Sequence, residues 1–220
     1  KNFRIRLGFG LHYGWAIEGA LGSHYKVDVT YLSPNVNMAA TLEGETKKYG
    51  VPILVSGEAY DKLSPYVKGY CRQIDSVDQG HGSELRLYTP LINDKHLKYT
   101  ESTSIDRHIL KTKERFYFKK VARTEILRGK SIGQNLFENS LQISIISGTV
   151  SPEFKKTFRK AYYLFEGGIW PTAKEMFDAV LKIDPEDGPT RFLLQYMEKM
   201  GGVAPHDWKG VRKEAGGMGH

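Results

Sequence analysis

The sequence predicts an α+β fold, in which a sheet-forming first part is followed by a helical last part. Short apolar runs of strand length dominate residues 1–92, and one stretch with helical periodicity interrupts them. Residues 151–215 instead carry apolar side chains at spacings of three and four. The 220 residues are 40% apolar and 12% aromatic, which is enough for the core of one or two domains. This composition excludes disorder, collagen and coiled coil as descriptions of the whole chain.

Six strands and two helices are expected in residues 1–92. The apolar runs predict strands at residues 5–14, 15–21, 28–32, 51–55, 70–77 and 85–88. Helix 34–49 is marked by Ser33 as its N-cap and by Pro34 at its first position, and it ends before Gly50. A shorter helix is expected at residues 57–63.

Three helices are expected in the last part. The first carries one apolar stripe, whose members are Phe154, Phe158, Ala161, Tyr162 and Phe165. The second is expected at residues 171–183, and the third follows the turn at residues 184–189. The spacing over residues 170–185 matches the second half of a tetratricopeptide repeat (TPR), which predicts a TPR-like helical hairpin unit. A single such unit cannot bury its own apolar face, so we expect it to pack on the first part or on a partner.

The net charge of +7 is concentrated in one stretch of the chain. Residues 1–93 carry 10 Lys and Arg against 9 Asp and Glu, and residues 131–220 carry 11 of each sign. Residues 94–130 carry 11 basic against 5 acidic residues. We therefore interpret residues 93–150 as a basic linker between two nearly neutral parts, and we expect no nucleic-acid partner. Contact of this stretch with RNA or an anionic lipid surface is the less ordinary alternative.

Cysteine usage and hydropathy predict a cytoplasmic location. Cys71 has no second cysteine to pair with, so the chain forms neither an internal disulfide nor a thiolate metal site. Its apolar runs fall short of the roughly 20 residues that a membrane helix needs. Because the chain opens at Lys1 without a signal peptide, we expect a piece of a longer polypeptide. The cytosolic part of a membrane-bound protein and a part of a cytoskeletal assembly both stay open.

Three motifs in fixed order carry a resemblance to a known family. They read Gly-Leu-His-Tyr-Gly at residues 10–14, Gly-Ala-Leu-Gly-Ser at residues 19–23, and Asp-Val-Thr-Tyr-Leu-Ser-Pro-Asn-Val-Asn-Met-Ala-Ala-Thr-Leu-Glu at residues 28–43. These motifs resemble the Gly-x-His-x-Gly strand, the Gly-x-x-Gly-Ser turn, and the Asp-x-Thr strand with its following helix in class III adenylate and guanylate cyclases. The resemblance covers roughly residues 3–90. Residues 170–208 resemble the helical extension of large cyclases.

This resemblance implies the C-terminal half of a ferredoxin-like cyclase domain, which converts ATP or GTP to a 3′,5′-cyclic nucleotide and pyrophosphate. Cyclase sites are built between two such domains, so the implied partners are the nucleotide and a second cyclase domain in the same or another chain. The reaction needs Mg²⁺ or Mn²⁺ to activate the attacking oxygen and to hold the triphosphate. In the family, two aspartates on strands before the Gly-x-His-x-Gly strand hold these ions. We therefore expect this chain to hold no metal by itself.

The resemblance also implies roles for individual residues. Asn37 occupies the position of the asparagine that hydrogen-bonds the ribose, and Thr30 that of a residue that helps to select the base. Thr41, one helical turn after Asn37, replaces the arginine that stabilises the transition state. A threonine hydroxyl is short and uncharged, so it cannot replace a guanidinium. Gln79 and His81 stand where the family commonly has lysines that reach the triphosphate.

Two hypotheses about function remain open. In the first, the chain is the arginine-less half of a working cyclase in cyclic-nucleotide signalling, and it needs a partner domain for activity. In the second, it is a pseudocyclase, a catalytically inactive dimerisation or scaffold module that docks into a larger assembly through the helical unit 151–215. The choice between ATP and GTP also stays open, because the residue that pairs with Thr30 would lie upstream. His12 is interpreted as a packed, hydrogen-bonded residue and not as a base.

Overall fold

The chain divides into two compact units. The first holds Lys1–Lys62, Cys71–Pro90 and Pro152–His220, and the second holds Leu63–Tyr70 and Leu91–Ser151. The computed structural model describes residues 7–80, 82–92, 120, 123, 124, 127–129, 131–139, 143, 147, 148 and 150–213. The start of the predicted strand 5–14, His81 and most of the predicted linker 93–150 therefore lie outside the described residues.

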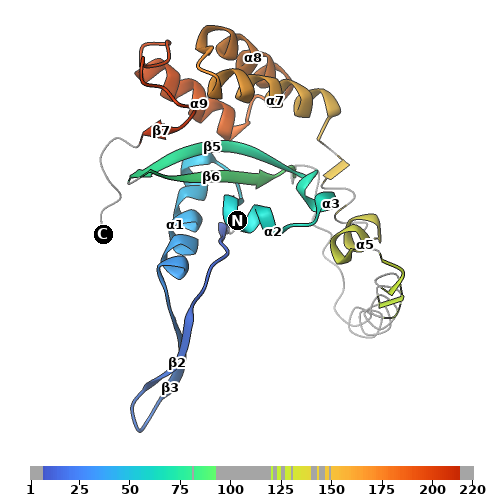
Figure 1. The fold of residues 1–220 in the computed structure, drawn as a ribbon. Coiled ribbons are helices and arrows are strands. Elements are labelled where there is room, and N and C mark those ends of the chain that lie inside the picture. The colour runs from blue at the N-terminus through green and yellow to red at the C-terminus, as the bar shows by residue number, and fades with distance from the viewer. Residues whose placement is uncertain are drawn as a thin grey trace, which may run out of the picture. The chain divides into compact units, whose positions relative to one another are not determined.

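A five-stranded sheet of order β1-β4-β6-β5-β7 forms the centre of the first unit (Figure 1). Its strands are β1 (Phe9–Leu11), β4 (Ile53–Ser56), β6 (Ser83–Pro90), β5 (Cys71–Gly80) and β7 (Arg212–Lys213). β1 is parallel to β4, and β7 is parallel to β5, whereas β6 is antiparallel to both of its neighbours. Val77 in β5 pairs with Arg212 in β7, so the C-terminal part of the chain adds the last strand to the sheet.

Helices cover both faces of the central strands in this unit. They are α1 (Pro34–Tyr49), α2 (Gly57–Lys62), α7 (Pro152–Glu166), α8 (Trp170–Ile183) and α9 (Gly188–Lys199). Figure 1 shows α1 on one face of β5 and β6 and α7 to α9 on the opposite face. The Ser33 side chain caps α1, and Gly50 ends it with a φ of 64°, in the left-handed region. Leu42 of α1 and Ile74 of β5 are almost fully buried in the core of this unit.

The C-terminal helices have an aromatic core of their own. Phe158, Phe165, Trp170 and Phe177 are 2% exposed or less. The rings of Phe165 and Trp170 stack at 5.5 Å between centroids, and the Trp170 indole N–H donates to the Phe165 carbonyl oxygen. The predicted apolar stripe therefore faces inward, because every one of its members is buried.

A two-stranded hairpin extends away from the sheet in the same unit (Figure 1). It consists of β2 (Ile17–Gly22) and β3 (Val27–Leu32), which are antiparallel. Every residue of both strands is exposed. A lone two-stranded ribbon is marginally stable in water, so this exposure is unusual for a segment with so many apolar side chains.

The second unit is described over two short helices, α3 (Pro65–Lys68) and α5 (Ile132–Asn139). Tyr66, Tyr70 and Phe137 form an aromatic cluster between them, with the Tyr70 and Phe137 ring centroids 4.3 Å apart. Gly133 lies against Val67, where an added β-carbon would overlap a valine methyl group. The small residue at this position therefore lets α5 approach α3 closely.

The predicted α+β class is confirmed, and most elements lie where the sequence places them. The helix at 34–49 has the predicted bounds, and the six predicted strands are all present with shifted ends. Three elements were not predicted: the short helix α3, the two-residue strand β7, and helix α5, which lies inside the predicted linker 93–150. The ferredoxin-like description, the TPR-like description and the boundaries 1–92, 93–150 and 151–215 stay predictions. No helix within the described ranges is long and apolar enough to cross a membrane.

Candidate functional site

Strand β1 and helix α1 lie unusually close together, and glycines make this possible. A β-carbon built at Gly10 would lie 2.5 Å from the Glu43 amide nitrogen and 2.9 Å from the Leu42 β-carbon, and closer still to the Ala39 carbonyl oxygen. Gly14 likewise lies against the Asn35 side chain, where a β-carbon would overlap the amide group. The glycines of the Gly-x-His-x-Gly motif thus hold the face of β1 against α1.

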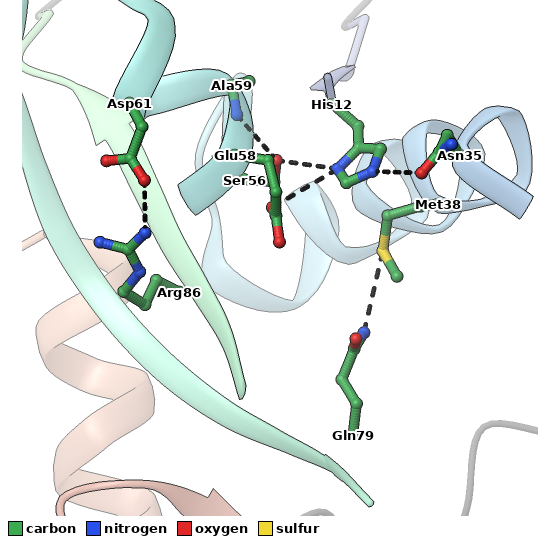
Figure 2. A network of polar contacts seen from close by, with 9 residues as sticks. All are labelled: His12, Asn35, Met38, Ser56, Glu58, Ala59, Asp61, Gln79 and Arg86. Atoms are coloured by element: carbon green, nitrogen blue, oxygen red, sulfur yellow. Dashed lines mark hydrogen bonds and ion pairs between the residues drawn. The ribbon is translucent and has the colours of Figure 1, made fainter. Parts of the chain in front are cut away.

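The histidine of the same motif connects three elements (Figure 2). His12 Nε2 lies 3.0 Å from Asn35 Oδ1, and Nδ1 lies 2.8 Å from Ser56 Oγ. The Asn35 amide nitrogen donates to the Trp15 carbonyl oxygen, so Oδ1 is left to accept from the histidine. Ser56 Oγ accepts from the Ala59 N–H at the start of α2 and can donate its own proton to Nδ1.

A tautomer with the proton on Nε2 satisfies the contacts with Asn35 and Ser56 at once, and the Glu58 carboxylate lies 3.7 Å from Nδ1 (Figure 2). His12 therefore fastens the end of β1 to the first turn of α1 and to the junction of β4 and α2. Both ring nitrogens are occupied, and Ser56 is fully buried. This arrangement agrees with a structural histidine and leaves it no free nitrogen for base catalysis. The sequence marked His12 by its motif, but its partners Asn35 and Ser56 were not foreseen.

Asn37 and Thr41 lie on one face of α1, as their spacing predicts. Asn37 is exposed and Thr41 is half-buried, so both can be reached from outside the helix. Thr30 lies on another element, the exposed strand β3, where it pairs with Gly19 across the hairpin. The structure thus brings Asn37 and Thr41 together and places Thr30 on the hairpin that leads into the helix.

The tip of β5 reaches α1 beside Asn37. The Gln79 side-chain nitrogen lies 4.0 Å from the sulfur of Met38, the residue after Asn37 (Figure 2). Gln79 is exposed and uncharged. The position at which the resemblance implies a lysine therefore lies next to the candidate helix face, but it brings no fixed positive charge there. His81 lies outside the described residues.

The described residues do not form a metal site. Within the ranges the structure describes, no three His, Cys, Asp or Glu side chains lie close enough together to hold an ion. The donor set on the α1 face is an amide and a hydroxyl, whereas Mg²⁺ in enzymes is usually bound through carboxylates. The residues present do not fit the Mg²⁺ or Mn²⁺ of a complete cyclase.

A buried ionic cluster lies at the opposite end of α1, and sequence reasoning missed it. Asp75 Oδ2 accepts hydrogen bonds from Tyr49 Oη at 2.5 Å and from Arg212 Nε at 2.8 Å, and Oδ1 accepts from the Ser76 N–H at 2.8 Å. Burial raises the pKa of Asp75, while the Arg212 charge and the Tyr49 hydrogen bond lower it. The guanidinium and backbone N–H groups can only donate, so we treat Asp75 as a carboxylate.

Arg212 keeps its charge in this cluster. Burial by itself lowers the pKa of Arg212, but the Asp75 carboxylate and Tyr49 outweigh it, so the pKa lies above its usual value. The Tyr49 hydroxyl is buried next to Asp75, and its pKa is raised well above the usual value, by burial first and by the carboxylate second. No local sequence signal marks this cluster, because Asp75 lies 137 residues before Arg212 in the chain.

A short segment of the chain is similar to known adenylate cyclases. An adenylate cyclase of Anabaena cylindrica is 38% identical over 61 residues, which is 28% of this chain and 12% of that protein. Adenylate cyclase 1 of Rhizobium meliloti (strain 1021) is 38% identical over 67 residues, which is 30% of this chain and 10% of that protein. The match thus spans at most 12% of these relatives.

Two solved structures of a bacterial light-regulated adenylyl cyclase are 28% identical to the chain. They cover 42% and 43% of this chain and 25% of their own chains, with TM-scores of 0.33 and 0.32. No protein-family model matches the chain. The two curated relatives, together with the motifs around His12 and Asn37, show that this chain contains a cyclase-related domain.

Proposed function

We propose that this chain supplies one half of a class III nucleotidyl cyclase site and acts with a second cyclase domain. The reaction converts ATP or GTP to a 3′,5′-cyclic nucleotide and pyrophosphate, in cytoplasmic cyclic-nucleotide signalling. The observation that carries the proposal is the placement of Asn37. It is exposed on α1, and its helix is fixed to β1 by Gly10 and to β4 by way of His12.

Asn37 has the right chemistry to hold a ribose. Its amide donates and accepts hydrogen bonds at the same time, as a ribose hydroxyl and ring oxygen require. Thr41 can offer one hydroxyl from the same face, but it cannot stabilise the charge that develops on the phosphate. Loss of one such donor typically lowers a rate by on the order of 10² to 10³. We therefore assign the metal-binding aspartates and any transition-state cation to the partner domain or to other parts of the protein.

The exposed hairpin supports a partner domain. One face of β2 and β3 presents Ile17, Leu21 and Leu32, and the other presents Val29 and Tyr31, all more than half exposed. Apolar side chains on both faces of a two-stranded ribbon mark a surface that is normally covered by protein. A second cyclase domain that clasps the hairpin would cover it and would bring its own site residues toward Thr30 and Asn37.

A catalytically inactive module is the second candidate, because the Thr41 and Gln79 positions both lack a charge. A complementation assay distinguishes the two. The chain is mixed with a class III cyclase domain that keeps its metal-binding aspartates but lacks its own ribose-binding asparagine and transition-state arginine. Cyclic-nucleotide formation is then measured with Mn²⁺ and ATP or GTP.

We expect Thr41→Arg to raise the rate of the mixture by on the order of 10² to 10³, and Asn37→Ala to remove the gain. Lys47→Arg, on the same helix and away from this face, is the matched control and should change nothing. A stable complex that stays inactive with Thr41→Arg would favour the scaffold function.

A further inference from the structure

We propose that residues of α9 and β7 form a brace that fixes the C-terminal end of α1, so that the C-terminal helices position the helix that carries Asn37. The inference rests on the proposed cyclase function for its catalytic meaning. Its structural part stands on contacts within the first unit. The brace consists of Asp187, Gly188, Phe192 and Arg212, and it acts on Tyr49, the last residue of α1.

Arg212 connects three elements through one buried side chain. Its Nε lies 2.8 Å from Asp75 of β5, and its Nη2 lies 3.2 Å from the Tyr49 hydroxyl of α1. The guanidinium carbon lies 5.1 Å from the ring centroid of Phe192 and 5.6 Å from that of Tyr196, both in α9. The Arg212 and Asp75 side chains are 5% and 0% exposed. Removing the arginine would leave a buried carboxylate without its cation.

The first turn of α9 touches the last turn of α1 directly. A β-carbon at Gly188 would overlap the Tyr49 carbonyl oxygen and lie 3.0 Å from the Gly50 α-carbon. The Phe192 and Tyr49 rings lie 4.6 Å apart. Contact this close leaves the end of α1 little room to move without moving α9.

A second ion pair fixes α9 to the sheet. Asp187 caps α9 by accepting from the Thr190 N–H, and its carboxylate is also paired with both terminal nitrogens of Arg72 in β5. The Arg72 guanidinium lies over the Phe158 ring of α7, at 4.1 Å from its centroid. α9 is thereby a fixed support and not a loosely attached arm.

The distance along α1 explains why such a support matters for Asn37. Twelve residues separate Asn37 from Tyr49, which is about 18 Å of helix at 1.5 Å per residue. If the Tyr49 end stayed in place but the helix axis tilted by about 5°, Asn37 would move by roughly 1.5 Å, so the brace must fix the direction of the axis as well as the position of that end. A misplacement of about 1 Å can lower a rate by about 10². His12 holds the first turn of the helix, so the brace supplies the other fixed end.

The test uses the full chain with Arg212→Met, and Lys213→Met as the matched control. Lys213 is the neighbour in β7, is exposed, and pairs with Asp207 at the surface. Hydrogen exchange is followed in peptides from α1, α9 and the β2–β3 hairpin. We expect Arg212→Met to speed exchange in both α1 and α9 by about 100-fold or more, with the hairpin unchanged. Lys213→Met should leave all three unchanged.

Faster exchange in α9 and β7 with α1 unchanged would overturn the brace. If Arg212→Met does not fold, Tyr49→Phe serves as the test variant, because it removes the hydroxyl that bridges Asp75 and Arg212 and keeps the ring. Faster exchange in α1 of this variant supports the brace, and unchanged exchange refutes it. In the complementation assay with the Thr41→Arg chain, adding Arg212→Met or Tyr49→Phe should lower kcat and leave KM unchanged. Coupled exchange without any cyclase activity would keep the brace and refute the cyclase function.

Discussion

Replacing Gly10 by alanine tests the close contact between β1 and α1. The added β-carbon would meet the Ala39 carbonyl oxygen, the Glu43 amide nitrogen at 2.5 Å and the Leu42 β-carbon at 2.9 Å. Two of these atoms belong to the helix backbone, so they cannot rotate away as a flexible side chain would. The strand and the helix would have to separate by about 1 Å. Overpacking of this kind costs about 1 to 3 kcal/mol, and we expect the upper end because backbone must move.

Thermal and urea unfolding, followed by circular dichroism, measure this cost. A loss of about 3 kcal/mol should lower Tm by roughly 6 to 12 °C in a domain of this size. Gly19→Ala is the matched control, because a β-carbon there has no atom within 4 Å. It should change the free energy of unfolding by less than about 0.5 kcal/mol. Equal stability of the two variants would refute the close-packing explanation of the motif.

Two further predictions follow from buried titratable groups. Burial raises the pKa of the Cys71 thiol from 9.0 to about 11, so at pH 8 its thiolate fraction should be about 100-fold below that of an ordinary cysteine. A disulfide reagent should therefore react with Cys71 at least that much more slowly in the folded chain. Equal reaction rates in folded and urea-unfolded protein would contradict this prediction. Burial also raises the pKa of Tyr49 above its usual 10.0. Above about pH 10 the folded state therefore retains a proton that the unfolded state releases, so the free energy of unfolding should fall as the pH rises. Tyr49→Phe should weaken this pH dependence in urea titrations at pH 9 to 11, and an unchanged slope would show that Tyr49 is not responsible.

The elements that the sequence predicted well are those with local signals. Helix α1 has the predicted bounds because Ser33 and Pro34 mark its start and Gly50 its end, all within one or two residues of the helix itself. The hairpin strands also follow from local apolar runs. β7 has no such signal, since two charged residues at its position favour exposure. Its place depends on Asp75, which lies 137 residues earlier in the chain.

In the candidate site, too, the features with local sequence signals were predicted, and those that depend on distant residues were not. The spacing of Asn37 and Thr41 predicted one helix face, and that is where they lie. The apolar neighbours of His12 on a predicted strand indicated that the histidine is packed, but its partners could not be deduced because Ser56 lies 44 residues away. The roles of Asn37, Thr41 and Thr30 stay predictions, since they depend on a bound nucleotide and a partner domain.

Helix α1 packs into the core with one set of side chains and presents the candidate nucleotide-binding residues with another. The departures from the cyclase pattern concern the second set. Leu42 and Tyr49 are buried and hold the helix in place, whereas Asn37 is exposed. Thr41 and Gln79, which lack the family's charges, are half-buried and exposed respectively, so neither is among the fully buried side chains that hold the helix. The departures therefore alter the chemistry offered to a nucleotide and leave the support of the helix intact. An arginine at position 41 should consequently be accepted with little loss of stability, which makes Thr41→Arg a clean test of catalysis.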